Sequence, residues 1–266
     1  MSDFLGGLLT RRIAVLVVIV LSQCAGLTVI AIAVAAAGES PPDAAFIPYA
    51  AAAGLAGVCG LAAFYRGLAM GKMSVVAPIS SMAVLVPVIV GLATGDRPSA
   101  VQTVGAAVGI VGVVLASREA TEEAETDRRV AAGVGLALLS GLAFGLFFVG
   151  MDAAADHDPL WANLVNRGTS LSLAALALFI FRPGFSGVTR QMVPVLVVIG
   201  VLEMSANVAF AFAATEGLLS ITSVLASLYP VVVVFLSWVV LHERLQPSQK
   251  VGVAAAFGGV ALIAGG

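Results

Sequence analysis

The sequence predicts an all-α integral membrane protein, and three of its features support that class. Of the 266 residues, 60% are hydrophobic and 11% are charged, whereas soluble domains carry about 25% charged residues. The hydrophobic residues form runs long enough to cross a bilayer, which takes about 20 residues of helix. The second half of the chain also repeats features of the first half, an organisation found in many membrane transporters.

Nine apolar stretches qualify as membrane-spanning helices. Most are separated by short connections such as GESPPD and GDRPS, whose glycine and proline residues end helices. The first stretch follows basic residues like a signal peptide, but its apolar run exceeds the roughly 7–15 residues of such a signal. The predicted spans are 13–37, 45–65, 74–94, 99–117, 131–151, 159–181, 192–214, 218–241 and 248–265.

The distribution of basic residues predicts the orientation of these spans. One side of the membrane would hold eleven lysines and arginines, whereas the other side would hold only Arg97. Since cytoplasmic loops are enriched in basic residues, we expect the first side to be cytoplasmic, in the inner or plasma membrane of the cell. The acidic connections around Glu39 and Asp156 and the carboxyl terminus then face outward. The eleven residues are Arg11, Arg12, Arg66, Lys72, Arg118, Arg128, Arg129, Arg182, Arg190, Arg244 and Lys250.

The two halves share a sequence pattern. GDRPSAVQTVG at 95–105 is similar to HERLQPSQKVG at 242–252, and both the glutamine and the final glycine recur after 147 residues (249 − 102 and 252 − 105). We expect the acid and arginine that precede them to cap helices and pair locally. The polar segment SREATEEAETDRR separates the halves, so the predicted domains are 1–117, a linker at 118–129, and 130–266.

The chain begins with MSDFLGGLLTRR, which resembles the end of a helix. In the register of the repeat, SDFLG at 2–6 aligns with FFVGM at 147–151, so the equivalents of 131–145 would precede Met1. Either that part of the helix has been lost, or the start codon has been placed too late; we favour the second explanation. For Asp3, which would lie in or at the end of this helix remnant, we favour a structural role over a role in coupling.

Two long segments resemble the EamA domain of the drug/metabolite transporter superfamily. SITSVLASLYPVVVVFLSWVVLHERLQPSQKVGVAAAFGGVALIAGG is similar to the family's closing helix pair, and FYRGLAMGKMSVVAPISSMAVLVPVIVGLATGDRPSAVQTVGAAVGIVGVVLAS to the corresponding part of its first repeat. The resemblance implies two inverted repeats of five helices. Nine full spans and the amino-terminal remnant are present here, and the family's usual Trp-Gly pair before the stretch matching SDFLGG is missing. Family members are generally drawn with both termini in the cytoplasm, but the basic residues place them outside, and we follow the basic residues.

Charged residues within two spans are the first candidates for function. A charge at the middle of a span costs about 2.5–3.5 kcal/mol on insertion scales. Glu203 lies near the centre of its span, Asn207 shares its helical face one turn later, and Arg167 lies within 159–181. Two interpretations remain open. Arg167 binds an anionic group of a substrate while Glu203 exchanges protons or balances the arginine, or the two form a buried pair that only fixes the helix register.

Further candidates lie beside prolines or align with Arg167. A proline within a helix frees a backbone carbonyl, and interrupted helices line binding sites in transporters. Ser227 and Tyr229 therefore become candidates because they precede Pro230, and Ser81 is the counterpart in the first half. These prolines are equally explained by packing alone. Gln23 aligns near Arg167 in the repeat and would be its uncharged partner.

Nothing in the sequence indicates an enzyme. It contains no HExxH, GxSxG or Gly-Lys-Ser/Thr motif, and both histidines lie in or beside connecting segments. Cys24 and Cys59 lie within apolar stretches, so we expect neither a disulfide nor a metal site, and no cofactor. A net charge of −2 does not favour nucleic acid as a partner.

The resemblance implies a secondary transporter. We expect an exporter or exchanger of a small metabolite or drug-like solute, which works by alternating access around a central cavity and is driven by a proton gradient or by exchange. Its expected partners are the small-molecule substrate and the lipid bilayer. The alternative is a membrane subunit or scaffold that shares the fold and transports nothing. Transport by the reconstituted protein distinguishes the two.

Overall fold

A computed structural model describes residues 1–10, 12–70, 76, 79–116, 128–184, 187–228, 231 and 247–265. These residues form ten α-helices and three short 3-10 helices, and they contain no strand. The α-helices are α1 (Ser2–Leu9), α2 (Val15–Ala37), α3 (Ile47–Met70), α5 (Leu85–Thr94), α6 (Ala100–Ala116), α7 (Arg128–Ala155), α8 (Pro159–Phe181), α9 (Val193–Glu216), α10 (Leu219–Ala226) and α12 (Pro247–Gly265). The 3-10 helices are η1 (Ala44–Phe46), η2 (Met82–Val84) and η3 (Arg190–Met192).

The predicted all-α membrane fold is confirmed. Within the described residues, five helical segments are long and apolar enough to cross a membrane, and each matches one predicted span. Three shorter apolar helices fall within the predicted spans 74–94, 99–117 and 248–265. Of the span 218–241, the structure describes α10, while most of the remainder lies outside the described residues. The five long segments are Val15–Ala37, Ala44–Ala69, Gly135–Ala155, Pro159–Phe181 and Arg190–Glu216.

Local sequence explains where several helices begin. Asp158 caps α8, because its Oδ1 accepts a hydrogen bond from the Trp161 amide at 2.8 Å, and Pro159 occupies the first helical position, where its missing amide hydrogen costs nothing. At the start of α6, the Ser99 side chain accepts from the Gln102 amide at 3.1 Å, and the Gln102 side chain accepts from the Ser99 amide at 2.9 Å. This reciprocal pair is a capping box.

The Asp96 carboxylate caps a helix in the other half of the chain. Its Oδ2 accepts a hydrogen bond from the Ser220 amide at 2.8 Å, in the first turn of α10. A Cβ atom at Gly91 would overlap this carboxylate, so a glycine there leaves room for it. The predicted capping role of Asp96 is therefore correct, but the capped helix is 124 residues away rather than adjacent.

Prolines coincide with the two interrupted spans. The 3-10 helix η2 precedes Pro87 in α5, and α10 ends at Ala226, four residues before Pro230 in the sequence. A proline cannot donate to the carbonyl four residues earlier, so neither segment continues as one regular α-helix. Both interruptions lie within predicted spans.

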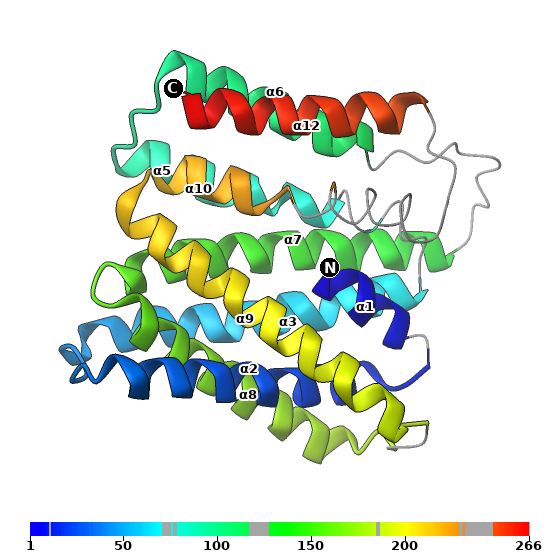
Figure 1. Ribbon diagram of the computed structural model, residues 1–266. Coiled ribbons are helices and arrows are strands. Elements are labelled where there is room, and N and C mark those ends of the chain that lie inside the picture. The colour runs from blue at the N-terminus through cyan, green and yellow to red at the C-terminus, as the bar shows by residue number, and fades with distance from the viewer. Residues whose placement is uncertain are drawn as a thin grey trace.

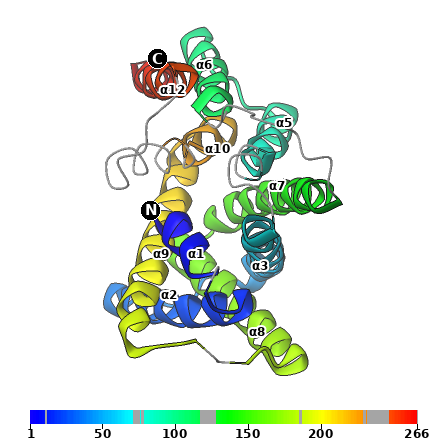
Figure 2. The ribbon, with the colours of Figure 1, turned by 90° about the vertical axis from the view of Figure 1, so that its right-hand side faces the viewer.

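The helices of the two halves pack against one another in matching pairs. α6 lies along α12 and α5 along α10, while α2 lies beside α8, as the two views show (Figures 1 and 2). α3 contacts α7 and α8, and α2 and α1 both contact α9. In the predicted repeat, α1, α2 and α3 correspond to α7, α8 and α9. The α3–α8 contact therefore corresponds to the α2–α9 contact, and the α3–α7 contact corresponds to the α1–α9 contact. This pairing agrees with the predicted repeat, whose boundaries stay a prediction.

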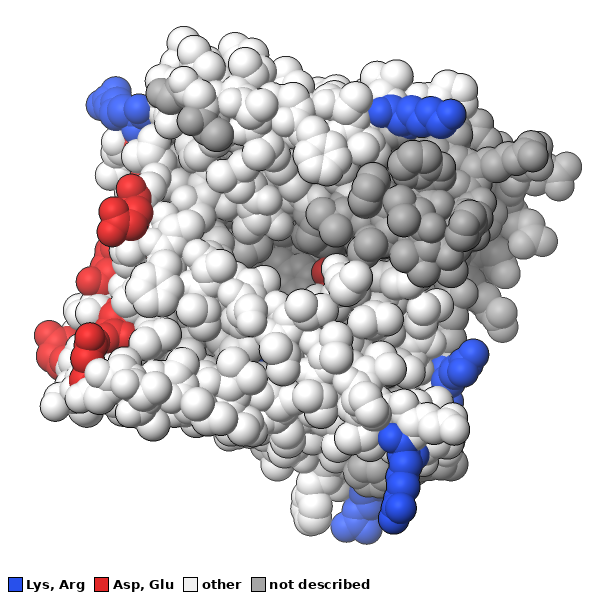
Figure 3. Space-filling view, viewed as in Figure 1, with Lys and Arg blue, Asp and Glu red and all other residues white. Residues whose placement is uncertain are grey.

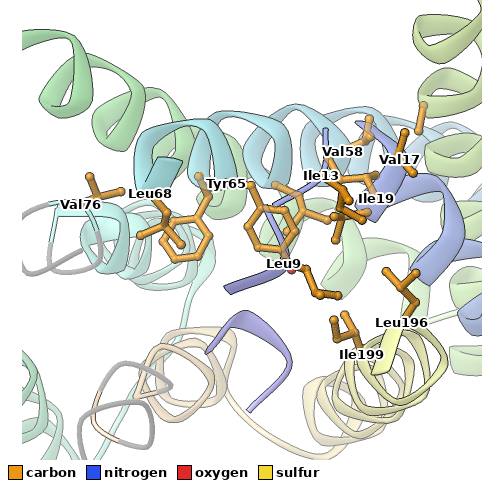
Figure 4. Close-up of a cluster of buried hydrophobic side chains, with 14 of the residues drawn as sticks. Leu9, Ile13, Val17, Ile19, Val58, Tyr65, Leu68, Val76, Leu196 and Ile199 are labelled. Carbon is orange, nitrogen blue, oxygen red and sulfur yellow. The ribbon is translucent and has the colours of Figure 1, made fainter. Parts of the chain in front are cut away.

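The short helix α1 is anchored between the two halves. Leu9 at the end of α1 and Ile13 beyond it belong to one buried cluster with Tyr65 of α3 and with Leu196 and Ile199 of α9 (Figure 4). Gly6 lies directly on the Tyr65 hydroxyl, which a Cβ atom at this position would overlap. α1 therefore contacts both halves, although it has 8 residues where α7 has 28.

Charged side chains separate toward opposite ends of the molecule. Acidic side chains gather along one edge, and basic side chains lie mainly at the opposite edge (Figure 3). At the acidic end, the Asp43 carboxylate lies 3.4 Å from Nδ1 of His157. At the other end, Arg182 follows α8 and Arg190 begins η3. The molecule thus has the charge asymmetry from which the cytoplasmic side was predicted, while the orientation itself stays a prediction.

Candidate functional site

A cavity of about 480 Å³ lies among the helices of both halves. On one view of the surface, the face is hollowed near its centre, and an acidic side chain is visible at that depth (Figure 3). The lining residues come from α1, α2, α3, α7, α8, α9, α10 and η2. Its polar members are Ser2, Asp3, Gln23, Asn166, Arg167, Ser170, Glu203, Asn207 and Thr222.

Arg167 and Glu203 form an ion pair at the cavity wall. Nη1 of Arg167, on α8, lies 3.2 Å from Oε1 of Glu203, on α9. The arginine side chain is 2% exposed and the glutamate side chain 22% exposed. Removing two charges from water costs several kcal/mol per ion before any attraction is gained. The free-energy cost of burying this pair therefore has to be offset by further polar partners or accepted for a function of the pair.

Several buried polar atoms of the lining have no hydrogen-bond partner among the described protein groups. They include Nε and Nη2 of Arg167, Oε2 of Glu203, Oε1 of Gln23 and Nδ2 of Asn166. More than nine in ten buried polar groups in proteins are hydrogen-bonded, and an unsatisfied one costs about 1–3 kcal/mol. The wall thus contains buried donors and acceptors that the described protein groups leave unused.

Two glycines bring the backbone of α2 and α9 close to Arg167. A Cβ atom at Gly26 would lie 3.4 Å from Cζ and Nε of Arg167 and 3.2 Å from the Gly200 carbonyl oxygen. A Cβ atom at Gly200 would overlap the Ser22 carbonyl oxygen. Small residues permit such close helix approach, and here they place the guanidinium against the helix crossing.

Aromatic side chains form an apolar part of the cavity lining. The Phe148 and Phe210 rings have centroids 4.8 Å apart, and those of Phe147 and Phe148 lie 5.5 Å apart. Phe64 and Phe144 meet edge to face at 6.2 Å. These five phenylalanines of α3, α7 and α9 all line the cavity. A solute held there meets a polar group set and a broad apolar surface together.

The lining follows the internal repeat but differs in charge between the halves. Three residues of α3 and three of α9 line the cavity in pairs separated by 146 positions (203 − 57, 207 − 61 and 210 − 64). Equivalent positions of the two halves therefore face the same space, but the second half contributes the acid and the amide. The pairs are Gly57 and Glu203, Leu61 and Asn207, and Phe64 and Phe210.

The structure brings four of the seven predicted site residues together. Arg167, Glu203, Asn207 and Gln23 all line the cavity. Ser227 is buried outside the lining, where its hydroxyl donates to the Ser223 carbonyl at 2.8 Å.

The two remaining predicted residues do not join the described lining. Ser81 is buried immediately before η2, outside the lining. Tyr229 lies outside the described residues. The cluster around Pro230 is therefore described only in part.

The predicted site did not include the aromatic lining residues or five polar ones, namely Ser2, Asp3, Asn166, Ser170 and Thr222. Asp3 lines the cavity, although a structural role was favoured for it. Asn166 is buried beside Arg167 with an unpartnered amide, and its polarity within a span was the available signal. The phenylalanines carried no signal, since apolar residues in a span face lipid as readily as a cavity.

Comparisons with known proteins agree on the family and the fold. The model of the EamA-like transporter family matches residues 131–265. A solved structure described only as "Crystal structure of protein" superposes with a TM-score of 0.79 and 17% sequence identity, covering 99% of this chain and 96% of its own. A comparison with curated proteins found no match. At such low identity, the structural likeness shows the fold alone.

Proposed function

Because the chain belongs to the EamA-like transporter family, we propose that it is a secondary transporter of a small metabolite or drug-like solute. The family is a family of transporters within the drug/metabolite transporter superfamily, not of enzymes. Its model covers the half of the chain that contains both Arg167 and Glu203. The geometry of this pair then suggests how the chain binds a solute.

The Arg167–Glu203 pair at the cavity carries this proposal. Glu203 neutralises Arg167 through one guanidinium nitrogen. Nε and Nη2 remain without a partner among the described protein groups, and neighbouring guanidinium donors suit a planar anionic group such as a carboxylate. These nitrogens are buried, so a solute that carries such a group binds them when the cavity wall rearranges, while its apolar part packs on Phe148 and Phe210.

Transport proceeds by alternating access around the cavity. The lining is shared between helices of both halves, so a rocking movement of one half against the other opens it to either side of the membrane. The chain works as an exporter or exchanger, powered by a proton gradient or by a counter-transported solute. The basic end faces the cytoplasm, in the inner or plasma membrane.

Efflux from proteoliposomes tests this function for a solute whose identity is open. Liposomes that contain the full chain are loaded with a carbon-13-labelled extract of small metabolites, and mass spectrometry follows the labelled compounds that leave. We expect at least one compound to leave faster than from protein-free liposomes. Equal efflux of every compound under both an imposed pH gradient and exchange conditions would favour the scaffold interpretation.

A further inference from the structure

Among the described residues, the cavity lining contains two carboxylates and one basic side chain. Asp3 of α1 and Glu203 of α9 both line it, and Arg167 of α8 is the basic member of the lining. Arg167 pairs with Glu203 at 3.2 Å. Asp3 forms no ion pair with any residue that the structure describes. The two acids share the cavity but differ in whether a cation balances their charge.

Among the residues that the structure describes, no basic side chain pairs with Asp3. α1 packs against α3 and α9, and α9 contributes the Glu203 carboxylate, which carries the same charge as an ionised Asp3. The Met1 amino group, directly before α1, carries the opposite charge. Arg167 lies in the lining as well, but its hydrogen bond goes to Glu203.

Two carboxylates that share one cavity do not both remain ionised easily, because each negative charge favours protonation of the other group. The carboxylate that holds a cation keeps its charge, and the other one takes up the proton. We propose that Asp3 is the proton-binding carboxylate of the transport cycle and that Glu203 stays ionised as the counter-ion of Arg167. This assignment rests on the proposed transport function and names its coupling site.

The position of α1 connects this proton to the movement of the halves. One Asp3 carboxylate oxygen takes a proton from water on one side of the membrane, and that O–H bond breaks again when the cavity faces the other side. α1 contacts α3 of the first half and α9 of the second, and Gly6 lies directly on Tyr65. A movement of one half against the other therefore changes the distance between Asp3 and Glu203, and with it the affinity of Asp3 for the proton.

Infrared pH titration of the reconstituted full chain tests the assignment without a substrate. The carbonyl stretch of a protonated carboxyl group grows as the pH is lowered, and difference spectra between variants isolate one residue. We expect Asp3→Asn to remove a band that titrates in wild type. Asp3→Glu is expected to retain it at a shifted pH. As a control for any carboxylate, Glu39→Gln, in an exposed connection, leaves the band unchanged.

Glu203→Gln separates the two acids. We expect the band to persist and to titrate at lower pH, because the repulsive charge is gone and Arg167 is released. Loss of the band in Glu203→Gln, or its retention in Asp3→Asn, overturns the assignment and gives the proton to Glu203 or to another group.

A transport measurement distinguishes failure of the assignment from failure of the transport function. For the solute identified by efflux, Asp3→Asn is expected to abolish accumulation driven by a pH gradient but to retain solute–solute exchange. A merely structural role would lower both activities together and would overturn the proposal. If no solute is transported, the infrared titration still decides whether Asp3 binds the proton, so the two failures are separable.

Discussion

Nη1 of Arg167 and Oε1 of Glu203 lie 3.2 Å apart, and this contact uses only part of what either side chain can bind. Nε, Nη2 and Oε2 are buried without partners among the described protein groups. A buried ion pair contributes little net stability even when it is fully hydrogen-bonded. A pair that only fixed the helix register would be poorly built for that purpose, whereas a pair that receives a solute needs free donors.

Arg167→Gln is expected to destabilise the protein strongly. Removing the buried arginine leaves Glu203 without its counter-ion at the cavity wall, and breaking a buried pair costs about 3–5 kcal/mol. The double variant Arg167→Gln/Glu203→Gln is expected to recover most of this loss. Thermal unfolding in detergent, followed by circular dichroism, measures both. Equal melting temperatures for Arg167→Gln and wild type would contradict the buried pair.

Gly200→Ala is expected to lower stability by about 1–3 kcal/mol, as overpacking does. The added methyl group would overlap the Ser22 carbonyl oxygen, which is a backbone atom, so α2 and α9 would have to separate beside Arg167. Gly168→Ala is the matched control, because a Cβ atom there meets nothing within 4 Å. Alanine also favours the helix by about 1 kcal/mol over glycine. The melting temperatures of both variants test the crossing, and an equal response would argue against it.

Asp96→Ala is expected to cost about 1 kcal/mol, the usual value for loss of a helix cap. The Ser220 amide would lose the acceptor that it has at 2.8 Å, and the start of α10 would lose a favourable negative charge. Hydrogen exchange at the first turn of α10 should increase. Glu39→Ala, which removes an exposed acid from the α2–η1 connection, should leave that exchange unchanged. Unaltered exchange in Asp96→Ala would refute the long-range cap.

Cysteine labelling is expected to place the acidic end of the molecule outside the cell. In a background without Cys24 and Cys59, Ser40→Cys lies in an exposed connection at the acidic end and Thr189→Cys in an exposed connection at the basic end. A membrane-impermeant maleimide added to intact cells should label Ser40→Cys alone. Labelling of Thr189→Cys alone would reverse the orientation derived from the basic residues.

Much of the fold is predictable because membrane insertion imposes a simple length rule. The stretches 13–37 and 159–181 are apolar for about 20 residues or more, and both form single long helices. The ends of regular α-helix near Pro87 and Pro230 could also be predicted from the sequence, since proline removes a helical hydrogen bond. The contact of Asp96 with α10 was not predictable, because it joins segments that only the packed fold brings together.

Site residues were predictable where placing their side chain within a membrane span costs much free energy, as for charged groups. They were not predictable where that free energy is small, as for phenylalanine. Arg167 and Glu203 stood out because a charge within a span needs a partner. Ser227 was a weaker prediction, since a hydroxyl can satisfy itself on its own helix, as it does with Ser223. Phe147, 8% exposed in the cavity wall, and Phe181, 73% exposed at the end of α8, look alike in the sequence.

In the proposed function, the Arg167–Glu203 pair binds the transported solute rather than only holding two helices together. The measurement that tests this role most directly is efflux from proteoliposomes containing the Arg167→Gln/Glu203→Gln double variant, compared with wild type at equal protein content. We predict a folded protein with near wild-type melting temperature and no efflux of the solute. Efflux at the wild-type rate would contradict this role and reduce the pair to a structural contact.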